Sequence, residues 1–217
     1  MTTRITLRRD LSDLKQSIYE LGEKCIEISS LFNSIQTNYN QDLEDQLKEL
    51  IKEIKIESNK LHEQCFLVLT LQQPLIKDLR FVVGSLQVVI SLEKIADLFL
   101  VLLSTVDSTS FINRVIHQHF LDIGAQLENL LKSSLMMYLS SNITIQKNID
   151  TSRNIINASN DLIYKNILSG IGSSTGEEAQ IQAKLLSTLR ILEKLTDLII
   201  NITEQTIFIV RGKNITN

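Results

Sequence analysis

The octet SLEKIADL at residues 91–98 returns one hundred residues later as ILEKLTDL at residues 191–198. Five of the eight positions are identical, and the offset is close to half of the 217-residue chain. Self-similarity at such a distance indicates a duplicated structural unit. Each copy lies in the third apolar-periodic segment of its half. The sequence therefore predicts an all-α protein of six long helices, arranged as two tandem three-helix bundles related by internal duplication.

Hydrophobic residues of the first segment recur at alternating spacings of four and three, which is the period of a bundle helix. The series is Leu7, Leu11, Leu14, Ile18, Leu21, Cys25, Ile28, Phe32 and Ile35. Weaker forms of the pattern predict helices over residues 43–71, 75–103, 116–139, 144–168 and 175–211. Pro74 separates the second helix from the third, and Gly212 is expected to terminate the last. We place the bundles at residues 1–105 and 106–217.

The composition restricts the classes of function. Lysine and arginine number 22 against 25 aspartate and glutamate, a formal charge of −3, which argues against a nucleic-acid binder or an anionic-membrane binder that works through bulk charge. Cys25 and Cys65 lack a metal-type spacing, and no secretory leader is recognisable, so we expect reduced thiols in a cytoplasmic protein. The longest apolar stretch, residues 81–103, contains three charged residues, and a membrane span is not expected.

Two pairs of carboxylates stand at helical spacing in the duplicated octets. Glu93 precedes Asp97 by four residues, and Glu193 precedes Asp197 by four, so each pair shares one helix face about 6 Å apart at Cβ. Like charges at this distance repel, and a hard or borderline cation that coordinates both relieves the repulsion. In the last helix Asn201 continues the same acidic stripe toward Glu204. That stripe could hold more than one metal ion, or it could be solvated surface.

The first pair belongs to a helix with almost no polar face. At about 100° per residue, the arc that holds Glu93 and Asp97 also holds Leu86, Ile90 and Val101. Charges on an apolar surface are costly unless they are paired or ligated. We therefore expect this pair to be buried beside a partner, a metal or a lipid surface. A core position with a Lys or Arg neighbour is the alternative.

Little in the sequence points to catalysis. His117 and His119 are two residues apart and diverge around a helix, which disfavours a metal pair. Neither carboxylate pair belongs to the Glu-x-x-His motif of di-iron oxidases, because Ala96 and Thr196 occupy the histidine positions. No combination of nucleophile and base is evident, so the sequence predicts that the protein is not an enzyme.

Several motifs together resemble the PhoU family of phosphate-signalling regulators. They are the duplicated Leu-Glu-Lys-x-x-Asp-Leu, the segment QQPLIKDLR at residues 72–80 and the ending NITEQTIFIVRG at residues 201–212. Family members carry Gln-Gln-Pro…Asp-Leu-Arg before the third helix, a Glu-x-x-x-Asp motif in each half and a similar Asn-Ile-Ala-Glu…Gly ending. The interval from Asp78 to Glu93 also matches, and the resemblance extends over essentially the whole chain.

The resemblance implies a cytoplasmic homo-oligomer, in the simplest case a dimer, that associates with the phosphate ABC transporter and a phosphate-sensing histidine kinase. Such a protein restrains phosphate uptake and starvation signalling, and it reaches the membrane peripherally through its partners. The resemblance also implies divalent or iron-type metal ions on the acidic motifs. The candidate ligands by position are Glu193, Asp197, Asn201, Glu204, Asp161, Glu93 and Asp97. The candidate partner-binding residues are Asp78, Arg80, Glu93 and Asp97.

The chain departs from the family pattern mainly in its first half. Val101 and Ser104 occupy the places that correspond to Asn201 and Glu204, and Lys55 stands where the second helix usually offers an acid. We therefore expect metal chiefly in the second half and a docking role for the first motif. Two functions stay open. One is a regulatory adaptor of phosphate homeostasis that works through its acidic helix faces, and the other is a helical metal-buffering protein without a transporter partner.

Overall fold

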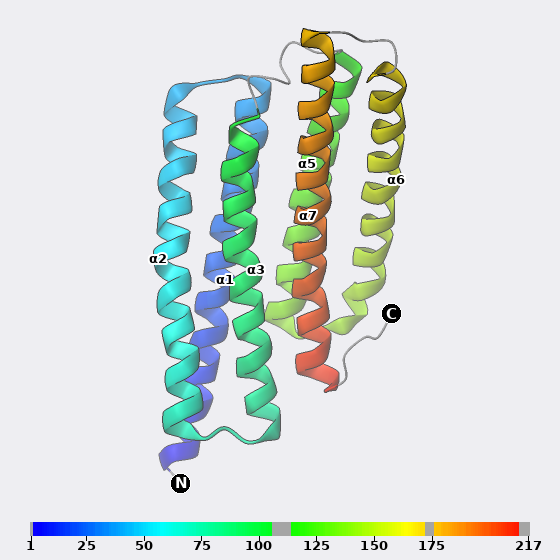
Figure 1. Ribbon diagram of the computed structural model, residues 1–217. Helices are drawn as coiled ribbons and strands as arrows, with labels where there is room; N and C mark the ends of the chain where they lie inside the picture. The colour runs from blue at the N-terminus through cyan, green and yellow to red at the C-terminus, as the bar shows by residue number, and fades with distance from the viewer. Residues whose placement is uncertain (1, 106–113, 172–175, 213–217) are drawn as a thin grey trace.

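The computed structural model describes residues 2–105, 114–171 and 176–212, which form six long α-helices and one short 3₁₀ turn (Figure 1). The helices are α1 (Thr2–Thr37), α2 (Gln41–Gln72), α3 (Ile76–Leu103), α5 (Arg114–Ser140), α6 (Gln146–Ile171) and α7 (Glu177–Arg211), and the turn is η1 (Ile143–Ile145). These residues contain no strand, so the predicted all-α class is confirmed. No helix among them has both the length and the apolar character needed to cross a bilayer.

Helix ends follow local signals in the sequence. Asn40 caps α2, because its side-chain oxygen accepts a hydrogen bond of 2.9 Å from the backbone N–H two residues later. Gln73 adopts a left-handed φ of 46° at the other end of α2, directly before Pro74. Gly212 has a φ of 71°, and its N–H donates to the carbonyl of Phe208 at 2.8 Å. The predicted terminator of the last helix is therefore confirmed.

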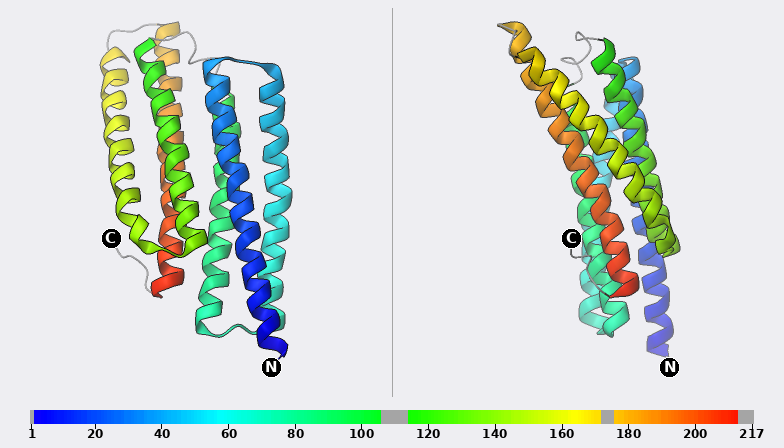
Figure 2. Two further views of the ribbon diagram at one scale, coloured as in Figure 1. Left: turned by 180° about the vertical axis from the view of Figure 1, so that it is seen from behind. Right: turned by 90° about the vertical axis from the view of Figure 1, so that its right-hand side faces the viewer.

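The helices form two groups that lie side by side, with α1–α3 in one and α5–α7 in the other (Figures 1 and 2). Within each group every helix contacts the other two, and the groups meet along two seams, α3 against α7 and α1 against α5. The buried side chains of both groups join into one continuous aliphatic core. The boundary that we placed at 105/106 adjoins residues 106–113, which lie outside the described residues.

Two glycines permit close approach at the seams. Gly22 of α1 lies against the buried side chain of Leu135 on α5, and a Cβ added there would overlap it. Gly84 of α3 lies against α7, where an added Cβ would stand 2.6 Å from Cγ1 of Ile209. The missing side chains let the helices of the two groups pack against one another.

Both cysteines lie in the core as free thiols. The Cys25 thiol donates a hydrogen bond of 3.5 Å to the carbonyl of Leu92. Burial raises the pKa of Cys65 to about 11 and raises the pKa of Cys25 further. Because only the thiolate is nucleophilic, these residues are structural.

Candidate functional site

The duplicated octets lie on α3 and α7, the two helices that contact each other most extensively. These helices run in opposite directions (Figure 1). Gly84 lies against Ile209, and Ser91 lies within hydrogen-bonding distance of Asn201, so residue numbers rise along one helix as they fall along the other. The antiparallel pairing brings the two octets to the same level of the bundle.

Equivalent residues of the two octets line one groove of about 450 Å³ between α3 and α7. The lining comprises Lys94, Asp97, Leu98, Lys194, Asp197, Leu198 and Asn201. The register set by Ser91 and Asn201 places Leu98 opposite Lys194, and Leu198 opposite Lys94. The groove therefore combines two half-buried leucines with two ammonium and two carboxylate groups, which the sequence repeat places almost symmetrically.

Asn201, one of the predicted metal ligands, is engaged within the protein. Its amide donates a hydrogen bond of 2.9 Å to the hydroxyl oxygen of Ser91 across the α3–α7 seam. Its carbonyl oxygen accepts a bond of 3.2 Å from the side-chain amide of Gln205. The amide of Asn201 therefore joins the two walls of the groove, and its carbonyl oxygen is engaged within α7.

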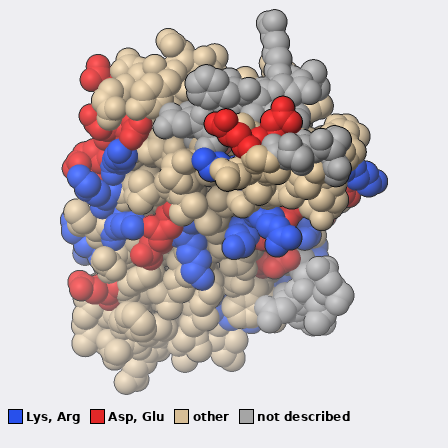
Figure 3. Space-filling view, turned by 45° about the horizontal axis from the view of Figure 1, so that its top comes forward, with Lys and Arg blue, Asp and Glu red and all other residues tan. Residues whose placement is uncertain are grey.

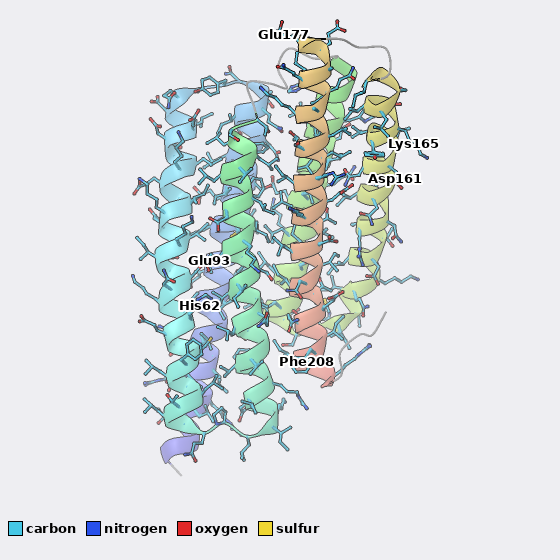
Figure 4. All side chains as sticks on the ribbon, in the orientation of Figure 1. His62, Glu93, Asp161, Lys165, Glu177 and Phe208 are labelled. Atoms are coloured by element: carbon cyan, nitrogen blue, oxygen red, sulfur yellow. The ribbon has the colours of Figure 1, made fainter. Side chains whose placement is uncertain are left out.

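The acids of the first motif are partly exposed within the chain, and their burial beside a partner, a metal or a lipid surface stays a prediction (Figure 4 labels Glu93). Lys55 of α2 places its Nζ 2.6 Å from Oδ1 of Asp97. Asp97 thus has a lysine neighbour, as the alternative required, but at a partly exposed position rather than in the core. Because the two side chains retain 44% and 46% of their exposure, this ion pair stabilises the fold by less than about 1 kcal/mol. Its main effect is to neutralise Asp97 where a metal would need a free carboxylate.

The acids of the second motif are more open. Glu193 and Asp197 are exposed on α7, Glu204 is half-buried, and Asp161 is exposed on α6 (Figure 4). Within residues 2–105, 114–171 and 176–212, no three His, Cys, Asp or Glu side chains are close enough to hold one metal ion. The structure therefore offers pairs of carboxylates rather than an assembled site, and metal binding stays a prediction.

Asp78 and Arg80 lie in the first turns of α3 and serve different purposes. Asp78 is half-buried, and its negative charge is favourable at the positive end of the helix dipole. The Arg80 guanidinium lies over Gly212, the residue that ends α7, where a Cβ would stand 2.6 Å from Nη1. A cation is favourable beside the last carbonyls of a helix. No ion pair joins Asp78 to Arg80 in the described structure, so Arg80 links α3 to the end of α7 instead.

Sequence periodicity did not identify the polar contacts inside the core. Ser85 of α3 and Tyr138 of α5 share a buried hydrogen bond of 2.8 Å, and burial raises the pKa of Tyr138. Thr203 of α7 donates to Ser134 of α5 at 3.0 Å. These hydrogen bonds connect α5 with both groove helices, α3 and α7.

The surface around the bundle carries both signs of charge. On the face shown in Figure 3, basic and acidic side chains are interspersed, and neither sign covers a broad region. Such a surface is suited to a partner with a mixed surface of its own.

The fold and the paired motifs define a helical protein made of two copies of a three-helix unit. Residues 18–100 match the PhoU domain. The phosphate-specific transport system accessory protein PhoU homolog of Clostridium acetobutylicum is 23% identical over 229 aligned positions, which cover 98% of each chain. These matches confirm the predicted resemblance to the PhoU family.

Two crystal structures share the fold over nearly their whole length. PhoU from Pseudomonas aeruginosa is 18% identical with a TM-score of 0.83, and the match covers 95% of this chain and 99% of that one. The phosphate transport system regulatory protein PhoU from Streptococcus pneumoniae is 19% identical with the same TM-score, and it covers 97% of this chain and 100% of that one. At these identities the likeness establishes the six-helix arrangement alone.

Proposed function

We propose that this chain is a regulatory adaptor of phosphate transport and not an enzyme. Its relative from Clostridium acetobutylicum is named as an accessory protein of a phosphate-specific transport system. By extension, this chain acts in the cytoplasm as a homo-oligomer, restrains a phosphate ABC transporter and limits signalling by a phosphate-sensing histidine kinase. It reaches the membrane peripherally, through these partners.

The groove between α3 and α7 is the observation that carries the proposal. Leu98 and Leu198 contribute apolar surface to its lining, together with the two lysines and two aspartates of the octets. Protein interfaces usually combine apolar surface with polar and charged groups. The groove offers carboxylates, ammonium groups and one amide, without a nucleophile beside a base. Recognition, rather than bond making, is the function that these groups support.

Exposed apolar residues extend this surface along α3. Leu100 and Val101 lie just beyond the first octet and expose 39% and 48% of their surface. Val101 takes the place of the second-half Asn201, so the first copy has exchanged a hydrogen-bonding residue for an apolar one. The exchange supports a docking role for the first motif, because apolar area removed from water stabilises a complex.

The experiment is co-purification of the transporter with the full chain and with Glu93→Ala/Asp97→Ala. We expect the double variant to retain its helicity, since both side chains are partly exposed, and to recover about tenfold less transporter. The matched control is Glu27→Ala/Glu63→Ala, which removes two exposed acids from α1 and α2. Normal recovery by Glu93→Ala/Asp97→Ala, or an equal loss in the control, contradicts the adaptor proposal.

The second candidate function is metal buffering, which the open carboxylates Glu193 and Asp197 favour. The first motif fits a metal poorly, because Lys55 already pairs with Asp97. Metal analysis of protein purified without an affinity tag separates the two functions. Several tightly held ions per chain that are lost in Glu193→Gln/Asp197→Asn favour metal buffering. A chain that holds no metal ion favours the adaptor function.

A further inference from the structure

A second cavity, also about 450 Å³, lies where α1 and α3 begin and α7 ends. In Figure 1 these three helix ends gather at the lower end of the molecule. The polar lining consists of Arg8, Ser12 and Lys15 from α1, Lys77 and Asp78 from α3, and Ser141 from the turn after α5. This cavity is separate from the α3–α7 groove, and the proposed adaptor function does not use it.

The cavity has an excess of positive charge. Three cationic side chains, Arg8, Lys15 and Lys77, face one carboxylate, Asp78, so the lining carries a net charge of +2. None of the three forms an ion pair in the described part of the chain, whereas Lys24, Lys48, Lys52, Lys55 and Lys132 all do. Cations collected in a cavity without matching acids attract anions.

Lys15 shows the imbalance most clearly. Its ammonium is partly buried, donates a hydrogen bond of 2.8 Å to the hydroxyl of Ser141 and lies 6.0 Å from the centre of the Tyr138 ring. Burial lowers the pKa of Lys15, because the ammonium has lost hydration without gaining a carboxylate. An anion in the cavity would supply the missing countercharge.

We propose that this cavity binds an oxyanion of the phosphate type. The ammonium groups of Lys15 and Lys77 and the guanidinium of Arg8 would neutralise it, and the hydroxyl of Ser12 would add a hydrogen bond. Arg and Lys are the usual side chains for phosphate, and hydrogen bonds to charged groups are the strong ones. The cavity falls within the volume range of small-molecule sites and has room for more than one phosphoryl group, so a phosphorylated molecule also fits.

The same phosphate chemistry has two sources, a free anion and a phosphomonoester lipid headgroup. The headgroup is a real alternative because the adjoining α2–α3 turn is strongly apolar. Leu71, Leu75 and Ile76 expose 76%, 66% and 76% of their surface at this end of the molecule. Exposed aliphatic residues beside cations are suited to the boundary of an anionic membrane.

The test uses calorimetric titration of the full chain with inorganic phosphate, at an ionic strength kept constant with sodium chloride. We expect saturable binding of one phosphate per chain, weakened about tenfold or more in Arg8→Gln/Lys77→Gln and in Lys15→Met. Arg8 and Lys77 are exposed, so the double variant should fold even if Lys15→Met does not. The matched control, Lys60→Gln/Lys165→Gln, neutralises two exposed lysines elsewhere and should bind like the parent.

A second arm separates the sources with sedimented phosphatidylcholine vesicles, prepared with and without phosphatidic acid. Vesicle binding that needs phosphatidic acid and Arg8/Lys77, without binding of inorganic phosphate, assigns the cavity to the headgroup. Binding of inorganic phosphate alone assigns it to the free anion. Binding of neither probe, or binding that the cavity variants retain, overturns the proposal. The transporter co-purification depends on other residues, so either proposal can fail alone.

Discussion

Lys55→Glu is the substitution that best tests why the first motif differs from the second. The Nζ of Lys55 lies 2.6 Å from Oδ1 of Asp97, with both side chains nearly half exposed. Exposed ion pairs contribute about 0.2–1 kcal/mol, so Lys55→Gln should lower the free energy of unfolding by at most about 1 kcal/mol. Glutamate adds a repulsion of about 1 kcal/mol in water-like surroundings, which brings the expected loss for Lys55→Glu to about 1–2 kcal/mol.

The glutamate variant should also gain a response to divalent cations. It would place a third carboxylate beside Asp97 and Glu93, and Mn²⁺ prefers such oxygen ligands. A cation that binds only the folded state adds about 2.7 kcal/mol at one hundred times its dissociation constant. Urea unfolding followed by circular dichroism, with MnCl₂ and then with excess chelator, measures both effects. Lys60→Glu, the same charge reversal at an exposed position of α2, is the control.

Two results would refute this reasoning. If Lys55→Glu unfolds at the same urea concentration as Lys55→Gln, the charge at residue 55 does not interact measurably with Asp97. If Mn²⁺ stabilises the parent chain as much as the glutamate variant, Lys55 is not what keeps metal from the first motif.

Three further predictions concern the core. Gly22→Ala should lower the free energy of unfolding, measured in urea, by about 1–3 kcal/mol, because its methyl group overlaps buried Leu135. Helix propensity alone predicts a gain of about 1 kcal/mol, so the sign of the measured change shows which effect is larger. Asn160→Leu should raise the free energy of unfolding by about 1–3 kcal/mol in the same assay, because the Asn160 amide is buried without a hydrogen-bond partner in the described structure. The pKa of Cys65 rises from 9.0 unfolded to about 11 folded, so its contribution to stability is constant below pH 9 and is lost as pH rises from 9 to 11. Between pH 9 and pH 11 the free energy of unfolding, measured in urea, should therefore fall less in Cys65→Val than in the parent chain. The difference between the two falls should reach about 2–3 kcal/mol at pH 11.

The sequence was sufficient to predict the helices but not what covers each of their faces. Apolar periodicity located all six helices, and Gly212 located the end of the last, because these signals act within one helix. The sequence did not show that Glu93 and Asp97 are partly exposed within the chain, because α3 contacts α1, α2 and α7, so apolar residues occupy most of its circumference. An almost wholly apolar wheel indicated burial, although a narrow strip of α3 stays open. Only packing could show that Lys55 of α2 reaches into that strip.

The same limit explains why the repeat predicted two motifs but not one groove. A duplicated unit that packs through its third helix forms a self-complementary contact, as two subunits do across a twofold axis. Leu98 then faces Lys194 just as Leu198 faces Lys94, and both octets reach one surface. Spacing along the chain contains no information about this pairing, because it depends on which face of each unit is left uncovered by its own two partner helices.

The shared groove also explains how the two copies could diverge. The offset of one hundred residues places Ile155 at the position of Lys55, and Ile155 is exposed and cannot form an ion pair. Asp97 is consequently neutralised from α2, whereas Asp197 has no described cation partner. Because both walls descend from one unit, a single substitution such as this changes one side of the groove and leaves the other intact. One wall of the groove thereby carries an aspartate paired with a lysine of α2, and the other carries an aspartate without that pairing, so the two walls offer different charges to a partner.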